Sequence, residues 1–232
     1  MKMTVKSSCL TFPALLITFL IFEFIPIDIV IQDFFYNFEF HQWILDKNSE
    51  IPKLIFYDGI KKIYILFVIG LLLSFIFLRQ QRIIIHNKKG LLIVLLSCIC
   101  VPLLIGLLKG VTNVPCPKDI RHYGGDYPYV TVLSEYPSTF KQTANIRCYP
   151  AGHASGGFAL MSLFFLFSTK RKKIIALISA ITLGWIIGNY KMLIGDHFFS
   201  HTLITMILSW LLILNINVGV GYFSFDRREK KP

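Results

Sequence analysis

Charged residues are scarce in this sequence. Asp, Glu, Lys and Arg make up 16% of its 232 residues, whereas 54% are hydrophobic and the mean hydropathy is +0.61. So few charges cannot cover the surface of a water-soluble globule of this length. The shortage therefore excludes a soluble domain and predicts an integral membrane protein in which residues 1–232 form one helical domain.

Segments typical of nucleic-acid binding are also missing, because no soluble stretch interleaves basic with aromatic residues. The sequence contains no internal repeat and no low-complexity tract. Its net charge of +11 lies mostly in short clusters between apolar runs. In a membrane protein, such clusters report topology and contact with anionic lipid headgroups. We therefore expect membrane lipids as partners and no nucleic acid.

The apolar runs predict an all-α, polytopic membrane bundle of about six transmembrane helices. The first run contains Glu23 and Asp28, and it lacks the short core and small-residue cleavage site of a signal peptide, so we expect a helix that is retained. Residues 33–62 mix aromatic and charged side chains, which is typical of an interfacial segment. The six expected spans are residues 10–31, 63–78, 91–108, 154–168, 174–193 and 198–220.

Dense basic clusters predict the orientation of these spans. Arg79 and Arg82 follow the second span, and residues 170–173 are all basic and follow the fourth. Placing these clusters in the cytoplasm puts both termini inside as well. The polar loop 110–149 and the starts of the fourth and sixth spans then face the outer side together. A loop of this length is more often functional than merely connective.

The five cysteines fall into two groups. Cys9, Cys98 and Cys100 lie in or beside apolar runs, where cysteine behaves as a small core residue. Cys116 and Cys148 lie near the two ends of the polar loop. They can form a disulfide if that loop faces an oxidising compartment, but the sequence leaves the distance between them open.

Two histidines stand where apolar runs begin on the outer side. His153 follows Pro150-Ala151-Gly152, and His197 follows Gly195-Asp196. A phosphate monoester carries about two negative charges, so its site needs cations and oriented N–H donors, which a helix start provides. One neutral imidazole can attack phosphorus, while a second can donate and accept a proton near neutral pH. The pattern therefore indicates a phosphate-handling site.

The spacing of the polar residues around these histidines carries a family resemblance. Lys109 is followed after six residues by Cys116-Pro117, and Lys191 is followed after five residues by His197 and after three more by His201. With Pro150-Ala151-Gly152-His153 between them, these motifs resemble those of the type 2 phosphatidic acid phosphatase superfamily. That superfamily includes membrane lipid phosphatases, some of them lipid A phosphatases, and shares its active-site plan with vanadate haloperoxidases. The resemblance covers about residues 91–211, with its core motifs at 109–201.

The resemblance implies a role for each matching residue. His197 would be the nucleophile that forms a phosphohistidine, and His153 would be the general acid that protonates the leaving alkoxide. Lys109 and Lys191 would bind the phosphate oxygens, and Gly152 would let backbone N–H groups approach them. The implied enzyme is a phosphoric monoester hydrolase that acts on lipid phosphates without a metal or another cofactor.

Four positions depart from the family's motifs. Cys116 replaces an Arg, Ala151 replaces a Ser, Lys191 replaces an Arg, and His201 replaces an Asp. A lysine lacks the planar fork with which arginine grips two phosphate oxygens. His201 can orient His197 as a hydrogen-bond acceptor only while His201 is neutral.

Residues of the polar loop are candidates to replace what is missing. Arg121 or Arg147 could supply the missing guanidinium, and Asp119 could supply the missing carboxylate. We take Arg121 as the candidate phosphate-binding residue of the loop.

Other classes of function stay open at this point. His197 and His201 are four residues apart and could bind zinc together with His153 and a carboxylate such as Asp196 or Asp119, although the lysines would then serve no purpose. A transporter or scaffold would need more polar residues at mid-membrane depth than the spans contain.

We expect a lipid phosphatase that cleaves a phosphate monoester or pyrophosphate at the outer face of the cytoplasmic membrane. A phosphotransferase of the same family is the related alternative. The sequence leaves open which lipid phosphate is the substrate and which oligomeric state the protein adopts.

Overall fold

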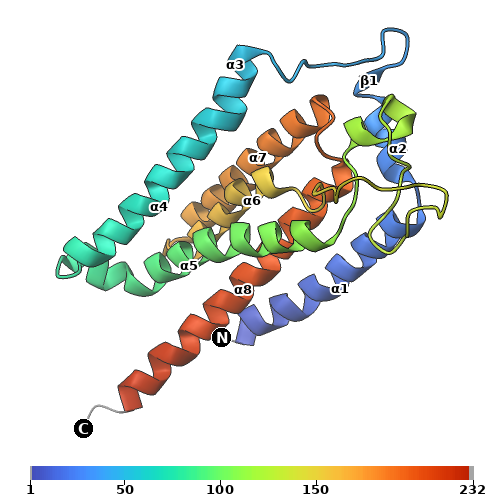
Figure 1. Cartoon of the computed structure of the whole chain (residues 1–232). Helices are drawn as coiled ribbons and strands as arrows, with labels where there is room; N and C mark the ends of the chain where they lie inside the picture. The colour runs from blue at the N-terminus through green and yellow to red at the C-terminus, as the bar shows by residue number, and fades with distance from the viewer. Residues whose placement is uncertain (1, 230–232) are drawn as a thin grey trace.

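A computed structural model describes residues 2–229, and it describes side chains for residues 7–222. The described chain is mainly helical, as expected (Figure 1). Its only strands in these residues are β1 (Tyr36–Asn37) and β2 (Gln42–Trp43), an antiparallel pair in which Tyr36 faces Trp43. The longer helical elements are α1 (Lys2–Phe24), α2 (Ile27–Asp33), α3 (Glu50–Lys53), the π-helical turn η1 (Leu54–Gly59), α4 (Ile60–Phe77), α5 (Arg82–Val111), α6 (Gly152–Ala159), the 3₁₀ helix η4 (Leu160–Phe165), α7 (Lys170–Leu193) and α8 (Phe199–Glu229).

Five helices of the described chain are long and apolar enough to cross a membrane. They cover Ser7–Phe24, Glu50–Phe77, Arg82–Val111, Lys170–Leu193 and Phe199–Tyr222. The segment expected as a further span, 154–168, consists of α6 followed by η4. Together these two elements are shorter than the about 20 residues that an α-helical span needs.

The expected interfacial segment 33–62 is only partly what the sequence predicted. Its first part forms the small β1–β2 hairpin, but from Glu50 onward the chain is already helical. Because α3, η1 and α4 follow one another without a break, the second long apolar helix begins at Glu50 and not at Ile63.

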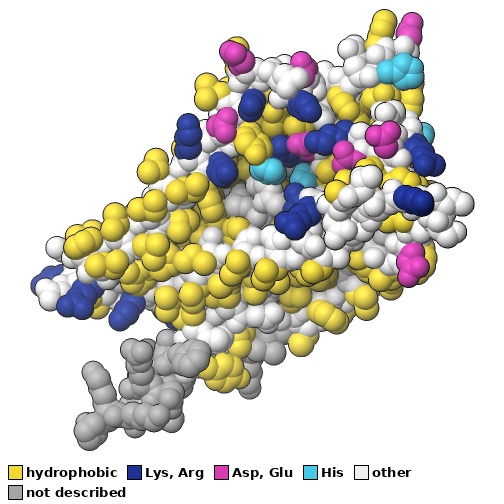
Figure 2. Space-filling model, viewed as in Figure 1, with side chains coloured by type: hydrophobic (Ala, Val, Ile, Leu, Met, Phe, Trp, Pro, Cys, Tyr) yellow, Lys and Arg dark blue, Asp and Glu magenta, His cyan; other side chains and the backbone are white. Residues whose placement is uncertain are grey.

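Large apolar side chains cover the outside of the bundle. Phe12 is 59% exposed, Leu66 is 67% exposed and Phe77 is 75% exposed. Figure 2 shows hydrophobic side chains along the whole visible face of α4. In water this exposure would be unfavourable, whereas hydrocarbon solvates such a surface, so the pattern agrees with a membrane environment.

Close contact between α6 and α7 places the start of α6 at the centre of the bundle. A Cβ atom on Gly157 would lie 2.8 Å from the backbone of Gly184, so only glycine permits this approach. At its first turn, α6 is joined to α8, because the Ala151 N–H donates to the His201 carbonyl at 3.2 Å and to Thr205 Oγ1 at 2.9 Å.

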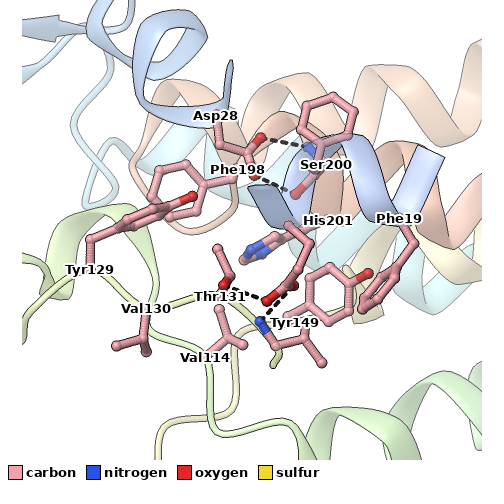
Figure 3. Close-up of a pocket in the computed structure, with 13 residues that line it drawn as sticks. Phe19, Asp28, Val114, Tyr129, Val130, Thr131, Tyr149, Phe198, Ser200 and His201 are labelled. Carbon is pink, nitrogen blue, oxygen red and sulfur yellow. Dashed lines mark hydrogen bonds between the residues drawn. The ribbon is translucent and has the colours of Figure 1, made fainter. Parts of the chain in front are cut away.

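The two acidic residues of the first apolar run hold other elements in place. The buried Asp28 carboxylate accepts hydrogen bonds from the Ser200 N–H, at 2.9 Å, and from the Ser200 hydroxyl (Figure 3). Burial raises the pKa of Asp28 to about 6, although both bonds from Ser200 oppose that shift. Glu23 accepts hydrogen bonds from Thr131 Oγ1 at 2.6 Å and from the Leu133 N–H at 2.8 Å. Asp28 therefore fixes the first turn of α8, and Glu23 fixes the polar loop.

A disulfide and several hydrogen bonds near its two ends hold the polar loop between α5 and α6 in place. A disulfide joins Cys116 to Cys148 with a Cα–Cα distance of 5.2 Å, so the pairing that the sequence left open is present. The Asn113 Oδ1 atom accepts hydrogen bonds from Gln142 Nε2 at 2.7 Å and from the Ile146 N–H at 3.0 Å. The loop also contains two 3₁₀ turns, η2 (Pro117–Asp119) and η3 (Arg121–Tyr123).

The turn between α7 and α8 is held from several sides. Gly195 has a φ of +73°, and a Cβ atom there would lie 2.3 Å from the Trp43 ring. The Lys118 N–H donates to the Gly195 carbonyl at 3.0 Å. Gln32 Nε2 donates to the Met192 carbonyl at 2.9 Å. The β1–β2 hairpin, α2 and the polar loop therefore all converge on this turn.

We predict that Gly195→Ala destabilises the turn. The left-handed backbone costs a non-glycine residue about 1–2 kcal/mol, and the new methyl group must also displace Trp43. The melting temperature in detergent should fall by several degrees. Gly106→Ala is the matched control, because nothing lies within 4 Å of its added Cβ, and it should be neutral or slightly stabilising. Equal melting temperatures for both variants would contradict the prediction.

We also predict that the double variant Cys116→Ser/Cys148→Ser is less stable than the wild type. Loss of a disulfide that links residues 32 positions apart costs about 3–4 kcal/mol in the chain-entropy view. Reductant should lower the melting temperature of the wild type but not of the double variant. Cys9→Ser removes an exposed free cysteine and should behave like the wild type. A wild type that is insensitive to reductant after unfolding and refolding would argue against the disulfide.

Candidate active site

Five of the residues singled out by the sequence come together from four helices. His153 is the second residue of α6, His197 lies in the turn between α7 and α8, and His201 is in the first turns of α8. Lys109 and Lys191 lie at the ends of α5 and α7. The ring centres of His153 and His197 are 6.3 Å apart. At that separation, one phosphoryl group can contact both imidazoles.

His197 and His201 form a buried pair. Each is 2% exposed, and their Nδ1 atoms are 3.4 Å apart. The backbone of Cys148 is a further hydrogen-bonding partner of the His201 ring. When His201 Nε2 donates to that carbonyl, His201 Nδ1 can accept a hydrogen bond from the His197 Nδ1–H group, and this arrangement leaves the lone pair of His197 on Nε2.

The surroundings of His197 favour its neutral form. Burial, together with the nearby His201 and Lys109, lowers the pKa of His197 well below its ordinary value. The Sγ atom of Cys148 lies 3.6 Å from His197 Nδ1, and it is part of the disulfide. These surroundings therefore favour a neutral imidazole, with one ring nitrogen unprotonated, at neutral pH, and this is the form that a nucleophilic histidine would require.

A carboxylate between two lysines forms the charged part of the site. Asp196 Oδ2 lies 2.8 Å from Lys191 Nζ, and Asp196 Oδ1 lies 2.6 Å from Lys118 Nζ. Lys191 is 4% exposed, so its charge needs a nearby partner to be tolerated. Burial alone would raise the pKa of Asp196, but Lys191 and Lys118 lower it below its ordinary value. Asp196 is thus ionised at neutral pH.

The first turn of α6 faces Lys109. A Cβ atom on Gly152 would lie 3.8 Å from Lys109 Nζ, which is an ordinary contact distance and shows that the two residues are neighbours. The N-cap residue, Ala151, makes no side-chain hydrogen bond to the helix. The N–H groups of the first turn therefore lack a side-chain cap and can bind an anion, which the helix dipole also favours.

Two of the loop residues proposed as replacements make hydrogen bonds within the loop. Arg121 is exposed, its Nε atom donates to the Asp126 carbonyl at 3.2 Å, and its guanidinium lies 5.8 Å from the Phe140 ring centre. Asp119 accepts a hydrogen bond from the Cys116 N–H at 3.3 Å and so stabilises the turn η2. Arg121 thus lies outside the group formed by the histidines and lysines, whereas Asp119 is near enough to Lys118 and Asp196 to interact with them electrostatically.

Two residues at the site were missed or misjudged in the sequence. Lys118 follows Cys116-Pro117 directly, so its position beside the first motif was a usable signal. Asp196 was considered only as a metal ligand, although it directly precedes His197. The ion pairs place both residues at the end of α7, beside Lys191.

The same geometry bears on the zinc hypothesis. Atoms of Cys148, His197 and His201 that could bind a metal lie within 4.8 Å of one another. The disulfide removes the Cys148 thiolate, however, and the Asp196 carboxylate is already paired with two lysines. Within this group, His197 and His201 then remain as donors, which is fewer than the three or four protein ligands of a typical zinc site.

An apolar groove opens beside His153. It has a volume of about 430 Å³ and lies between α4 on one side and α5, α6 and α7 on the other. Figure 2 shows acidic, basic and histidine side chains gathered next to the apolar face of α4. The groove is lined mainly by Ile60, Tyr64, Phe67, Leu160, Leu163 and Leu183.

Comparisons with known proteins agree with this site. Over 191 residues, the chain is 28% identical to the lipid A 4′-phosphatase of Francisella tularensis subsp. novicida (strain U112). The aligned region covers 79% of this chain and 81% of that protein. No solved structure matches the chain. The family model of the PAP2 superfamily matches residues 90–224, which confirms the resemblance drawn from the motifs. Because that match spans more than half of its residues, the chain belongs to the PAP2 superfamily.

Proposed function

We propose that this protein is a membrane lipid phosphatase that uses His197 as a nucleophile and needs no metal. The observation that carries the proposal is the meeting of two imidazoles and the ammonium groups of Lys109 and Lys191 beside an apolar groove. The cations and the first turn of α6 suit a phosphate, and the groove suits the apolar part of a lipid.

In the first step, the phosphate lies between His197 and His153. Its negative charge favours the protonated form of His153. His197 Nε2 attacks phosphorus, the bond from phosphorus to the lipid oxygen breaks, and His153 gives its proton to the departing alkoxide. Lys109 and Lys191 stabilise the charge on the phosphoryl oxygens as the bond breaks. A neutral lipid alcohol and a phosphohistidine at residue 197 result.

In the second step, His153 is neutral and can act as a base. It takes a proton from a water molecule, whose oxygen attacks phosphorus and breaks the phosphorus–nitrogen bond to His197. Inorganic phosphate leaves, and both histidines return to their starting states. The Asp196 carboxylate holds the Lys191 ammonium in place between turnovers.

The proposed substrate is a lipid with a terminal phosphate. The relative from Francisella is a lipid A 4′-phosphatase, and the groove beside His153 offers about 430 Å³ of mainly apolar space. Phosphatidic acid, phosphatidylglycerol phosphate, undecaprenyl pyrophosphate and lipid A are the candidates to compare.

We place the site at the outer face of the cytoplasmic membrane. The basic residues Arg79 and Arg82 lie where α4 ends and α5 begins, and the basic residues 170–173 lie at the start of α7. Along the chain, α5 separates the first group from the polar loop, and α6 with η4 separates the second group from it. Figure 1 places the turn between α4 and α5 at one end of the bundle and the loop between α5 and α6 at the other. Positive clusters favour the cytoplasm, and a disulfide favours an oxidising compartment. We count α6 and η4 together as one passage, although they are shorter than a regular helical span, and the resulting six passages would put both termini in the cytoplasm.

The first test is phosphate release by the purified protein from the four candidate lipids, with and without EDTA and vanadate. We predict release that survives EDTA and is blocked by vanadate. His197→Ala should lower the rate about 10³-fold or more, and His153→Ala about 10²–10⁴-fold. His122→Ala is the control, because that histidine is exposed and pairs with Asp33 at 2.8 Å outside the site.

Each failure of this test has a different meaning. Full activity of His197→Ala would contradict the phosphohistidine mechanism. Loss of activity with EDTA would favour a metal site instead. Transfer of the phosphate to a second lipid without release of inorganic phosphate would indicate a phosphotransferase.

We predict that the imidazole of His197 titrates at a lower pH than an ordinary histidine. Its lowered pKa means that the neutral, nucleophilic form persists as the pH falls through 6.5, and only more acidic solution protonates it. NMR of protein labelled at histidine can follow this titration, with the His197 signal assigned by its loss in His197→Ala. A midpoint at or above 6.5 would show that burial does not control this group.

A further inference from the structure

The π-helical turn η1 brings one aromatic residue of the groove wall to the site. This turn, Leu54–Gly59, joins α3 to α4. A Cβ atom on Gly59 would lie 2.8 Å from the Leu54 carbonyl oxygen, so glycine permits the wider turn. π-Turns inside helices occur frequently at functional sites. Phe56 and Tyr57 are two neighbouring residues of η1, and both are half-buried.

Tyr57 contacts two residues to which the mechanism assigns a role. The centre of its ring lies 4.8 Å from the ring centre of His153, with an angle of 40° between the rings. The Lys191 Nζ atom lies 4.4 Å from the same ring centre. One aromatic ring therefore supports both the general acid on α6 and the phosphate-binding cation on α7.

The neighbouring residue Phe56 has a different contact. Its ring stacks on Tyr190 with a centre-to-centre distance of 5.4 Å and an angle of 28°. Phe56 thus attaches the turn to α7, whereas Tyr57 reaches the charged residues. Phe56 therefore anchors η1 to α7, and Tyr57 is the residue of η1 that contacts the site.

We propose that Tyr57 is a positioning residue for catalysis, acting through His153 and Lys191. Its ring limits the orientations of the His153 imidazole, and its negative face holds the Lys191 ammonium towards the phosphate. A cation over an aromatic face is attracted most strongly where water is excluded, and Lys191 is only 4% exposed. This inference rests on the proposed phosphatase function, because it needs His153 and Lys191 to serve one phosphate.

The test compares Tyr57→Leu with Tyr57→Phe. The leucine variant loses the aromatic face, so kcat should fall about tenfold or more and the inhibition constant of vanadate should rise about tenfold. The phenylalanine variant keeps the ring and should restore both values to within about threefold of the wild type. Tyr57→Met keeps much of the volume without an aromatic face, and it serves as a second variant if the leucine protein does not assemble.

Leu71→Ala is the control for the packing of α4. Leu71 packs against the buried core and does not line the groove. The substitution should lower the melting temperature without changing vanadate inhibition. If Tyr57 served only to pack α4, its leucine variant would behave in the same way as Leu71→Ala.

Three results would overturn this inference while leaving the proposed function intact. The first is unchanged vanadate inhibition and kcat in both Tyr57→Leu and Tyr57→Met. The second is a change in KM alone, which would make Tyr57 only a wall of the lipid groove. The third is a phenylalanine variant as impaired as the leucine variant, because the hydroxyl group would then be the essential part. A wild type that neither binds vanadate nor releases phosphate from any lipid would overturn the proposed function, and this inference with it.

Discussion

The ion pairs of Asp196 are the interaction on which the site depends. Lys191 is almost completely buried, and a buried ammonium without a partner would be costly. Asp196 meets this need from the turn between α7 and α8, and it also binds Lys118 of the polar loop. The same carboxylate thus joins the end of α7 to the polar loop. Because Asp196 directly precedes His197, these ion pairs also hold the chain in place next to that histidine. The contacts of Trp43 and Gln32 with this turn keep the carboxylate where both lysines can reach it.

The histidines of the site could be predicted because their placement follows from local properties. Apolar runs and basic clusters predict the spans and their direction, and from these alone His153 and His197 are expected at the same face. The choice between Lys118 and Arg121 could not be predicted in this way. Both lie in one irregular loop, and its path depends on the Glu23 contacts with Thr131 and the residues beside it, more than 100 positions away along the chain.

The boundaries of the helices show a second limit of the sequence. Hydropathy measures how apolar a segment is, so Asp58, Lys61 and Lys62 made residues 33–62 resemble an interface. Helical structure continues through these residues nevertheless, because helix formation does not require apolar side chains. The opposite occurs at α6 and η4, where an apolar run becomes a short α-helix followed by a 3₁₀ helix that packs against α5 and α7.

The departures from the family's motifs balance one another in charge. Cys116 and His201 remove one cation and one carboxylate from the expected set, while Lys118 and Asp196 contribute one of each close to Lys191. The net charge that these residues could offer to a phosphate is therefore unchanged, but the contacts among the charged groups differ. The carboxylate now orients lysines, and His197 is left with a histidine, His201, as its ring partner. In the proposed mechanism, a neutral partner raises the basicity of His197 less than a carboxylate would, so phosphate binding by the cations provides a larger share of catalysis.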